Sequence, residues 1–134
     1  MTRESIKEVY EDFKNALERL KEALKEDSSE NSIIVDGTIQ RFEFTFELSW
    51  KLLKFILNYN GVDVDSPRPV IKEAFKTNLI QDGQGWIDML EDRNKTLHIY
   101  DEKQAMNIYN KIKETHCDLF CKLDIDVDEQ IFDF

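Results

Sequence analysis

Four side chains near one another in the sequence have the chemistry to act on a phosphate group: Arg93, Asn94, His98 and Tyr100. Histidine titrates near neutral pH and can move a proton, while arginine keeps its charge and grips phosphate oxygens in a fork. An asparagine beside them can orient either group. Because RNA brings its own 2′-hydroxyl nucleophile, such a set can serve a ribonuclease that uses no metal ion. From spacing alone, the alternative is an ordinary salt-bridged or capped pair at a helix end.

The relative positions of these side chains depend on where a helix ends. On an unbroken helix Arg93 and His98 would point about 140° apart, so they converge only if the helix ends or bends between them. Asp101 opens a pattern that resembles a capping box, which predicts that a new helix starts there. In an extended segment His98 and Tyr100 lie on the same side, and Asn94 shares a face with His98 if the helix persists. We therefore expect the four to gather at one exposed helix end.

Other candidate sites are weaker. His116, Cys117 and Cys121 could hold zinc only with a fourth ligand from elsewhere, and the pattern is more typical of buried, inert thiols. Glu47 has Lys51 one turn later, so we expect it on a solvated, ion-paired face. The chain has neither a glycine-rich phosphate loop nor the paired aspartates of a nucleotidyltransferase. We therefore expect no cofactor, no metal ion and no nucleotide-transfer site in this chain.

Apolar spacing of three and four residues predicts helices that position these groups. We predict an all-α fold, an antiparallel up-and-down bundle of four to five helices in a single domain, 1–123, followed by an acidic C-terminal tail, 124–134, that is either loose or a docking segment. The expected helices run from Ile6 to Leu24, from between Ser32 and Thr38 to Asn60-Gly61, from Ser66-Pro67 to near Asn78, from Asp82-Gly83 toward Arg93, and from Asp101 to about Leu123.

The second expected helix carries two apolar stripes. Each stripe needs a packing partner. The helix is therefore either the central helix of the bundle or a helix with one stripe on a dimer or partner surface. The first stripe is Ile39, Phe42, Phe46, Leu53 and Ile56, and the second is Phe44, Leu48, Leu52 and Phe55.

The composition limits the partners. The formal net charge is −10 and the chain has no basic cluster, so we expect no DNA binding and poor non-specific binding to any nucleic acid. No apolar run is long enough to cross a bilayer, and the N-terminus does not resemble a signal peptide, so we expect no membrane partner. Two cysteines make no disulfide framework, which favours a reducing cytoplasm.

Three stretches, together covering about Phe13 to Leu123, are similar to the nucleotidyltransferase substrate-binding family, a branch of the HEPN superfamily. They are Ile39 through Leu48 with Trp50-Lys51, Ser66-Pro67 with Glu73-Ala74-Phe75, and Met89 through Asn94 with His98 and Tyr100.

The resemblance implies a helical bundle that forms a homodimer and works with a minimal nucleotidyltransferase encoded nearby. In related toxin–antitoxin pairs the HEPN protein is an endoribonuclease. Carried onto this sequence, Arg93 and His98 would catalyse RNA cleavage in a cleft between protomers, assisted by Asn94. The nucleotidyltransferase would silence the toxin by attaching AMP to Tyr100. An AMP group there would add a bulky anion where an RNA phosphate would otherwise bind.

Three functions are thus open. The first is an endoribonuclease toxin controlled by AMP transfer to Tyr100. The second is a non-catalytic substrate-binding subunit of a nucleotidyltransferase complex. The third is a helical interaction protein in which the motif formed by Arg93, Asn94, His98 and Tyr100 only seals a dimer.

Overall fold

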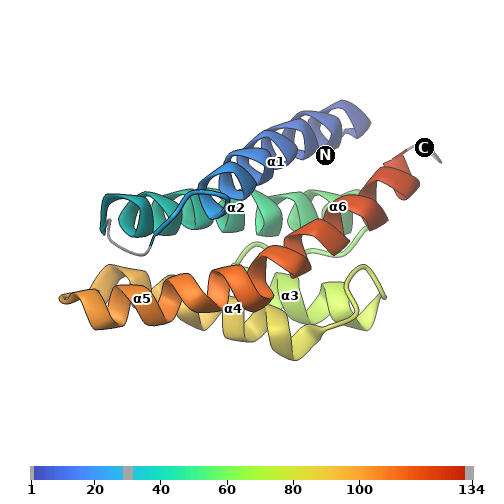
Figure 1. The fold of residues 1–134 in the computed structure, drawn as a ribbon. Coiled ribbons are helices and arrows are strands. Elements are labelled where there is room, and N and C mark those ends of the chain that lie inside the picture. Colours follow the sequence, from blue (N-terminus) through green and yellow to red (C-terminus); the bar gives the residue numbers. More distant parts are fainter. Residues whose placement is uncertain (1, 29–31, 132–134) are drawn as a thin grey trace.

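The computed structural model describes residues 2–28 and 32–131 of the chain. Its regular structure is helical, with no strand among the described residues, and this confirms the all-α prediction. α1 and α2 lie antiparallel in one layer, and α3, α4 and α5 lie in a second, with α6 rising from the second layer toward α1 (Figure 1). The helices are α1 (Arg3–Leu24), α2 (Ser32–Tyr59), α3 (Pro67–Lys76), α4 (Gly83–Lys95), α5 (Glu102–Lys111) and α6 (Cys117–Ile131).

The helix ends follow local signals in the sequence. Gly61, with φ of 87°, takes the left-handed conformation that glycine adopts readily. This turn lets the backbone N–H of Val62 donate to the carbonyl of Leu57 at 2.9 Å, which satisfies one of the last carbonyls of α2. Pro67 opens α3 directly after its cap residue Ser66, although the Ser66 side chain makes no capping bond. Both predicted boundaries are confirmed.

The core is built around the ring of Phe120 on α6. Its centroid lies 6.1 Å from that of Phe13 on α1, 6.1 Å from that of Phe42 on α2, and 5.9 Å from that of Trp86 on α4. Aromatic contacts at these separations add to the stabilisation from buried apolar area. Four helices are therefore joined at one point, and the bundle is a single packed unit.

α2 is the central helix of the bundle. All five members of its first apolar stripe are buried. The second stripe is divided: Leu52 is fully buried, Leu48 and Phe55 are half-buried, and the Phe44 side chain is 53% exposed. Of the two alternatives for this helix, packing inside one chain accounts for most of its apolar surface. The apolar surface of α2 around Phe44 is left exposed to solvent.

α5 and α6 are joined by a π-helical turn at Ile112–His116, where sequence spacing predicts one continuous helix. The buried positions Ile108, Ile112, His116 and Phe120 are four residues apart each time. On an ideal α-helix each such step overshoots a full turn by about 40°, so three steps drift by about 120°. A π turn holds more residues per turn, because its hydrogen bonds span five residues. The π turn therefore keeps all four side chains on the buried face.

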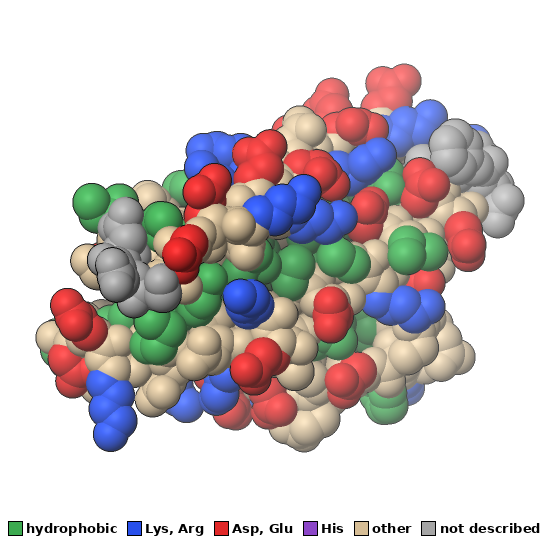
Figure 2. All heavy atoms as spheres, in the orientation of Figure 1, with side chains coloured by type: hydrophobic (Ala, Val, Ile, Leu, Met, Phe, Trp, Pro, Cys, Tyr) green, Lys and Arg blue, Asp and Glu red, His purple; other side chains and the backbone are tan. Residues whose placement is uncertain are grey.

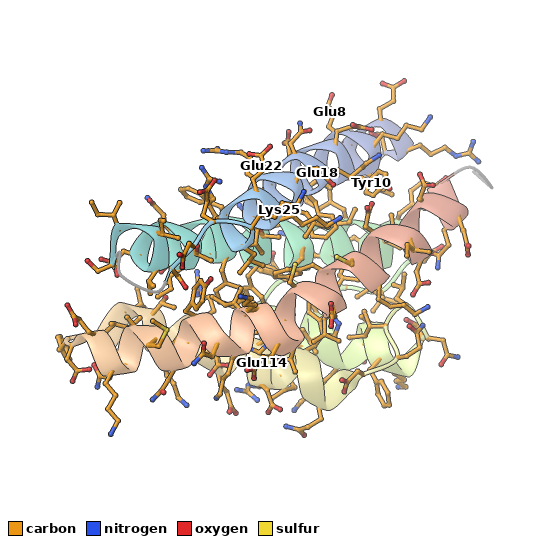
Figure 3. All side chains as sticks on the ribbon, viewed as in Figure 1. Glu8, Tyr10, Glu18, Glu22, Lys25 and Glu114 are labelled. Carbon is orange, nitrogen blue, oxygen red and sulfur yellow. The ribbon has the colours of Figure 1, made fainter. Side chains whose placement is uncertain are left out.

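The helix end predicted near Leu123 is wrong, because α6 continues to Ile131. Val127 is 1% exposed, and the Tyr10 hydroxyl of α1 donates to Asp124 at 2.7 Å and lies 3.3 Å from a carboxylate oxygen of Asp128. Tyr10 points from α1 toward this last part of α6 (Figure 3). Residues 124–131 thus continue the bundle instead of forming a loose tail, and residues 132–134 lie outside the described chain.

The contact between Tyr10 and α6 gives a test of this correction. Burial, with the hydrogen bond and charge of Asp124 and the charge of Asp128, raises the pKa of Tyr10, so its hydroxyl stays protonated and donates. Tyr10→Phe is expected to lower the free energy of unfolding by about 1.5 to 3 kcal/mol in urea denaturation, the range for a bond to a charged acceptor. Tyr59→Phe removes a hydroxyl that accepts a solvent-exposed bond from Arg3 Nε at 3.1 Å, and it should lower the free energy of unfolding by less, about 0.5 to 1 kcal/mol. Equal changes in the two variants would mean that α6 does not dock through Tyr10.

The surface carries acidic and basic side chains interspersed over α1 and α6, with no broad basic patch on the face in view (Figure 2). Among the described residues, no helix combines the length and the apolar character that a membrane crossing needs.

Candidate functional site

The site lies where α4 ends. α4 stops at Lys95 and the chain continues as one 3₁₀ turn, Thr96–His98, before extended backbone at Ile99. The Thr96 hydroxyl donates to the carbonyl of Arg93 at 2.6 Å, which ties down the last turn of the helix. The helix therefore ends between Arg93 and His98, as the sequence predicts.

His98 and Tyr100 project on the same side of this extended segment. The His98 Nδ1 atom lies 3.3 Å from the Tyr100 hydroxyl oxygen, and both side chains are exposed, Tyr100 to 79%. The predicted cap holds them in place. The Asp101 carboxylate accepts from the backbone N–H of Gln104 at 2.8 Å, and the Gln104 side-chain oxygen accepts from the backbone N–H of Tyr100 at 2.8 Å. The glutamine thus anchors the residue before the cap.

Arg93 reaches toward α2. Its Nη2 atom pairs with a Glu47 carboxylate oxygen at 3.0 Å, and its Nη1 atom donates to the Asn94 side-chain oxygen at 3.4 Å. The prediction that Glu47 lies on a solvated face paired with Lys51 is therefore wrong, since Glu47 reaches across to α4. Among the described residues, no hydrogen bond joins Arg93 to His98. Within one chain, His98 therefore contacts Tyr100 and Asn94 contacts Arg93. The four side chains form two neighbouring pairs.

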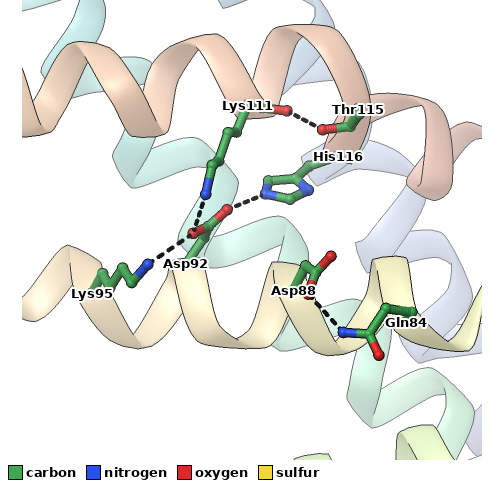
Figure 4. Close-up of polar contacts among 7 residues, drawn as sticks. All are labelled: Gln84, Asp88, Asp92, Lys95, Lys111, Thr115 and His116. Carbon is green, nitrogen blue, oxygen red and sulfur yellow. Dashed lines mark hydrogen bonds and ion pairs between the residues drawn. The ribbon is translucent and has the colours of Figure 1, made fainter.

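A buried carboxylate lies directly before this arginine. Asp92 is 2% exposed, and its carboxylate accepts from His116 Nε2 at 2.7 Å and from Lys111 Nζ at 3.3 Å, with Lys95 Nζ at 3.9 Å (Figure 4). Burial by itself raises the pKa of Asp92, but the hydrogen bonds and charges of His116 and Lys111 outweigh it and hold that pKa below its usual value. The ionised carboxylate ties α4 to α5 and the π turn just behind the site.

His116 is a structural partner of Asp92. Because a carboxylate only accepts, the hydrogen in this bond is on Nε2. The ring is 3% exposed and stacks on Phe42, with centroids 5.5 Å apart and planes 20° apart, and its Nδ1 atom has no partner. Among the described residues, no three His, Cys, Asp or Glu side chains are grouped to hold a metal ion. Burial, with the neighbouring Cys121, raises the pKa of the Cys117 thiol to about 12, which suits an inert thiol.

Comparison with known proteins supplies the family. The model of the family described as nucleotidyltransferase substrate binding protein like matches residues 8–129, nearly the whole chain. The chain belongs to this family.

Two individual proteins are similar to this chain, one in sequence and one in solved structure. The chain is 34% identical over 86 residues to a probable ribonuclease HepT from Haemophilus influenzae, a match that covers 60% of this chain and spans 59% of that relative's length. A protein of known crystal structure from Thermus thermophilus is 30% identical, with a TM-score of 0.73 over 89% of this chain and 98% of that one.

A second solved structure supports the fold alone. It is a Haemophilus influenzae protein described as having the fold of a substrate-binding domain of a nucleotidyltransferase. It is 22% identical, with a TM-score of 0.67 over 95% of this chain and 99% of that one. The helical bundle of the nucleotidyltransferase substrate-binding family is therefore the fold of this chain.

Sequence reasoning missed Asp92, although a signal was present. Trp86 and Met89 mark the buried face of α4, and Asp92 is the next position three residues on. His116 likewise follows Ile112 by four residues on the buried face of the last helix. A carboxylate and an imidazole that both fall on buried faces must find a charged or hydrogen-bonding partner. Their pairing follows from that requirement once the two faces are seen to meet.

Proposed function

We propose that this chain is a metal-independent endoribonuclease of the toxin type in a two-component nucleotidyltransferase system. The observation that carries the proposal is the 3.3 Å contact between His98 Nδ1 and the Tyr100 hydroxyl at an exposed helix end, five residues after Arg93. Because Nδ1 faces Tyr100, the exposed Nε2 atom, for which the described residues supply no partner, is available to move a proton. The likeness of part of the chain to a probable ribonuclease HepT supports a ribonuclease activity.

The proposed reaction uses the RNA 2′-hydroxyl as the nucleophile. His98 Nε2 takes the hydroxyl proton as the 2′-oxygen bonds to the adjacent phosphorus. The bond from phosphorus to the 5′-oxygen breaks, that oxygen takes up a proton from water, and His98 then releases its proton to solvent. The products are a 2′,3′-cyclic phosphate and a 5′-hydroxyl end. The Arg93 guanidinium exchanges Glu47 for the phosphate oxygens and stabilises the extra negative charge, while Asn94 holds the guanidinium in orientation.

A homodimer would complete this site by placing two copies of the motif face to face. Its support is the apolar surface left open near the motif: Leu97 is 70% exposed, Phe44 is 53% exposed, and Leu48 is half-buried beside it. Two arginines in one cleft would offset the acidic surface of the chain. Light scattering at micromolar concentration should give the mass of two chains, and the mass of one chain would contradict this part of the proposal.

Incubation of the purified protein with single-stranded RNA tests the proposed activity. Cleavage is expected, and it should persist in excess EDTA because no step uses a metal ion. Intact RNA, or cleavage that EDTA abolishes, would contradict the proposal.

We further propose that a minimal nucleotidyltransferase encoded nearby silences the toxin through Tyr100. The tyrosine oxygen would attack the α-phosphorus of ATP, releasing pyrophosphate and the hydroxyl proton. The exposure of the ring, 79%, makes it reachable by a second protein. The AMP phosphate would then lie beside His98, where the RNA phosphate binds.

Tyr100→Phe tests this regulation. In the presence of the partner and ATP, the wild-type chain should gain the mass of AMP by mass spectrometry and lose its RNA cleavage. Tyr100→Phe should gain no mass, and its RNA cleavage should be the same with and without the partner. Tyr59→Phe, which removes another exposed phenol, should behave as the wild type. An unshifted wild-type mass, or a mass gain in Tyr100→Phe, would overturn the proposed acceptor.

The second candidate is a non-catalytic substrate-binding subunit of the nucleotidyltransferase. Two observations favour it: Arg93 is already paired with Glu47, and the net charge of −10 repels RNA. A wild-type chain that leaves RNA intact but still receives AMP on Tyr100 would identify this role.

The proposed location is the reducing cytoplasm. Cys117 and Cys121 are both free thiols in the structure. Neither needs an oxidising compartment.

A further inference from the structure

A cavity of about 420 Å³ opens beside His98, between the 3₁₀ turn and α5. The side chains of Ile99 and Ile108 give it an apolar floor, and Ile108 is buried. Its volume falls in the range of ordinary small-molecule sites, about 300–1,000 Å³. Its polar lining consists of Lys95, His98, Gln104, Asn107, Asn110 and Lys111.

The polar lining of this cavity is cationic and neutral, in a chain with 28 acidic and 18 basic side chains. No carboxylate lines it, whereas each of four other cavities on the described surface includes at least one. Asp92 lies behind the two lysines, 3.3 Å from Lys111 Nζ and 3.9 Å from Lys95 Nζ, with its carboxylate buried. The two ammonium groups thus share one buried carboxylate, which leaves positive charge in excess along the cavity.

The amide side chains come from one face of α5. Gln104, Asn107 and Asn110 follow one another at three-residue intervals, so they rise along the helix as neighbours. An amide presents both a donor and an acceptor, which matches the paired donor and acceptor on the edge of a nucleobase. The cavity thus combines cations for a phosphate, amides for a base edge and an apolar floor for a flat ring.

We propose that this cavity binds one nucleotide, with Lys95 and Lys111 on its phosphate and Asn107 and Asn110 on its base. The inference rests on the proposed function in one respect: it makes the occupant either the RNA nucleotide next to the cut phosphate or the AMP group attached to Tyr100. Both are nucleoside phosphates within reach of His98, whose ring contacts Tyr100 and lines the cavity. Bases of single-stranded RNA are read in this way, on edges that are free to accept hydrogen bonds.

An NMR titration of the ¹⁵N-labelled chain tests the site. The probes are 5′-AMP, GMP, CMP and UMP, a short single-stranded RNA, and inorganic phosphate. A nucleotide should shift the side-chain amide signals of Asn107 and Asn110 until they saturate. Asn107→Leu and Lys95→Gln should each weaken binding about fivefold or more, the effect of one lost hydrogen bond or ion pair. Gln40→Leu and Lys72→Gln make the same kinds of change at exposed positions outside the cavity and should leave binding within twofold.

The set of ligands that bind distinguishes the two possible occupants, an RNA nucleotide and the AMP group on Tyr100. Binding of all four nucleotides and of RNA, weakened in both cavity variants, identifies an RNA subsite. Binding of AMP alone identifies a site for the AMP group. Phosphate that binds as well as any nucleotide, with Asn107→Leu unaffected, would overturn the proposal, as would the absence of any saturable shift. The titration and the cleavage assay test separate proposals. Nucleotide binding without RNA cleavage would contradict the proposed ribonuclease activity and support the nucleotide site. RNA cleavage without nucleotide binding would support the activity and contradict the site.

Discussion

Replacing His98 by alanine is expected to lower the rate of RNA cleavage by about 100-fold or more, the contribution typical of a positioned general base. The imidazole is the group of the motif that can take the 2′-hydroxyl proton, because a guanidinium is already protonated and an amide or a phenol is a far weaker base than an imidazole. The assay is cleavage of a labelled single-stranded RNA by equal concentrations of wild type and variant. The fold should be retained, since the His98 side chain is exposed.

Lys103→Ala provides the matched control for His98→Ala. It removes an exposed side chain from the first turn of α5, outside the site and the cavity, and should leave the rate within twofold. Circular dichroism of both variants confirms the helical fold. A His98→Ala rate equal to that of the control would mean that the observed cleavage has another source.

Replacing Asp92 by alanine is expected to lower the free energy of unfolding by about 3 to 5 kcal/mol, the cost of breaking a buried pair by removing one partner. His116 is 3% exposed and its ring would lose the one hydrogen-bond partner that the described residues give it, and Lys111 would lose the carboxylate that ties α5 to α4. A loss of this size is a large part of the total stability of a domain of this length, about 5 to 15 kcal/mol. Urea denaturation followed by circular dichroism measures it.

Asp88→Ala is the control for Asp92→Ala on the same helix. Asp88 is exposed and accepts a bond from the Gln84 side chain at 2.8 Å (Figure 4), so its loss should cost less than about 1 kcal/mol. Similar losses in the two variants would contradict the structural role of the buried pair.

The Asp92–His116 pair also predicts a dependence on pH. Because the pKa of Asp92 is lower in the folded than in the unfolded chain, the stability it contributes is fully present above its ordinary value of 3.8. It is lost as the pH falls through the lower, folded pKa. The difference in unfolding free energy between wild type and Asp92→Asn should therefore be constant at mildly acidic pH and shrink below 3.8. A difference that stays constant into strong acid would show that the carboxylate charge is not involved.

Much of the site could be predicted from local sequence. The Asp101–Gln104 cap fixed where α5 begins, and this alone placed His98 and Tyr100 on one side of an extended segment. Helix boundaries and their caps depend on neighbouring residues, so they can be predicted from the sequence. The same holds for the stop at Gly61.

Contacts between helices were harder to predict. Glu47 pairs with Arg93 and not with Lys51, because the choice depends on how α2 and α4 cross. The extension of α6 past Leu123 likewise depends on Tyr10, which lies on α1. Acidic residues along a helix face are typical of a solvated tail when no partner for them is visible in the sequence. Packing against a distant helix is what keeps this segment in the bundle.

The most direct test of the account is the chemical identity of the RNA ends. Mass spectrometry of the fragments made by the wild-type chain in excess EDTA should show 2′,3′-cyclic phosphate and 5′-hydroxyl ends. The same incubation with His98→Ala should leave the RNA intact. This result is expected because the proposed nucleophile is the 2′-hydroxyl and His98 takes its proton. Fragments with 5′-phosphate ends, or equal cleavage by the two proteins, would contradict the account.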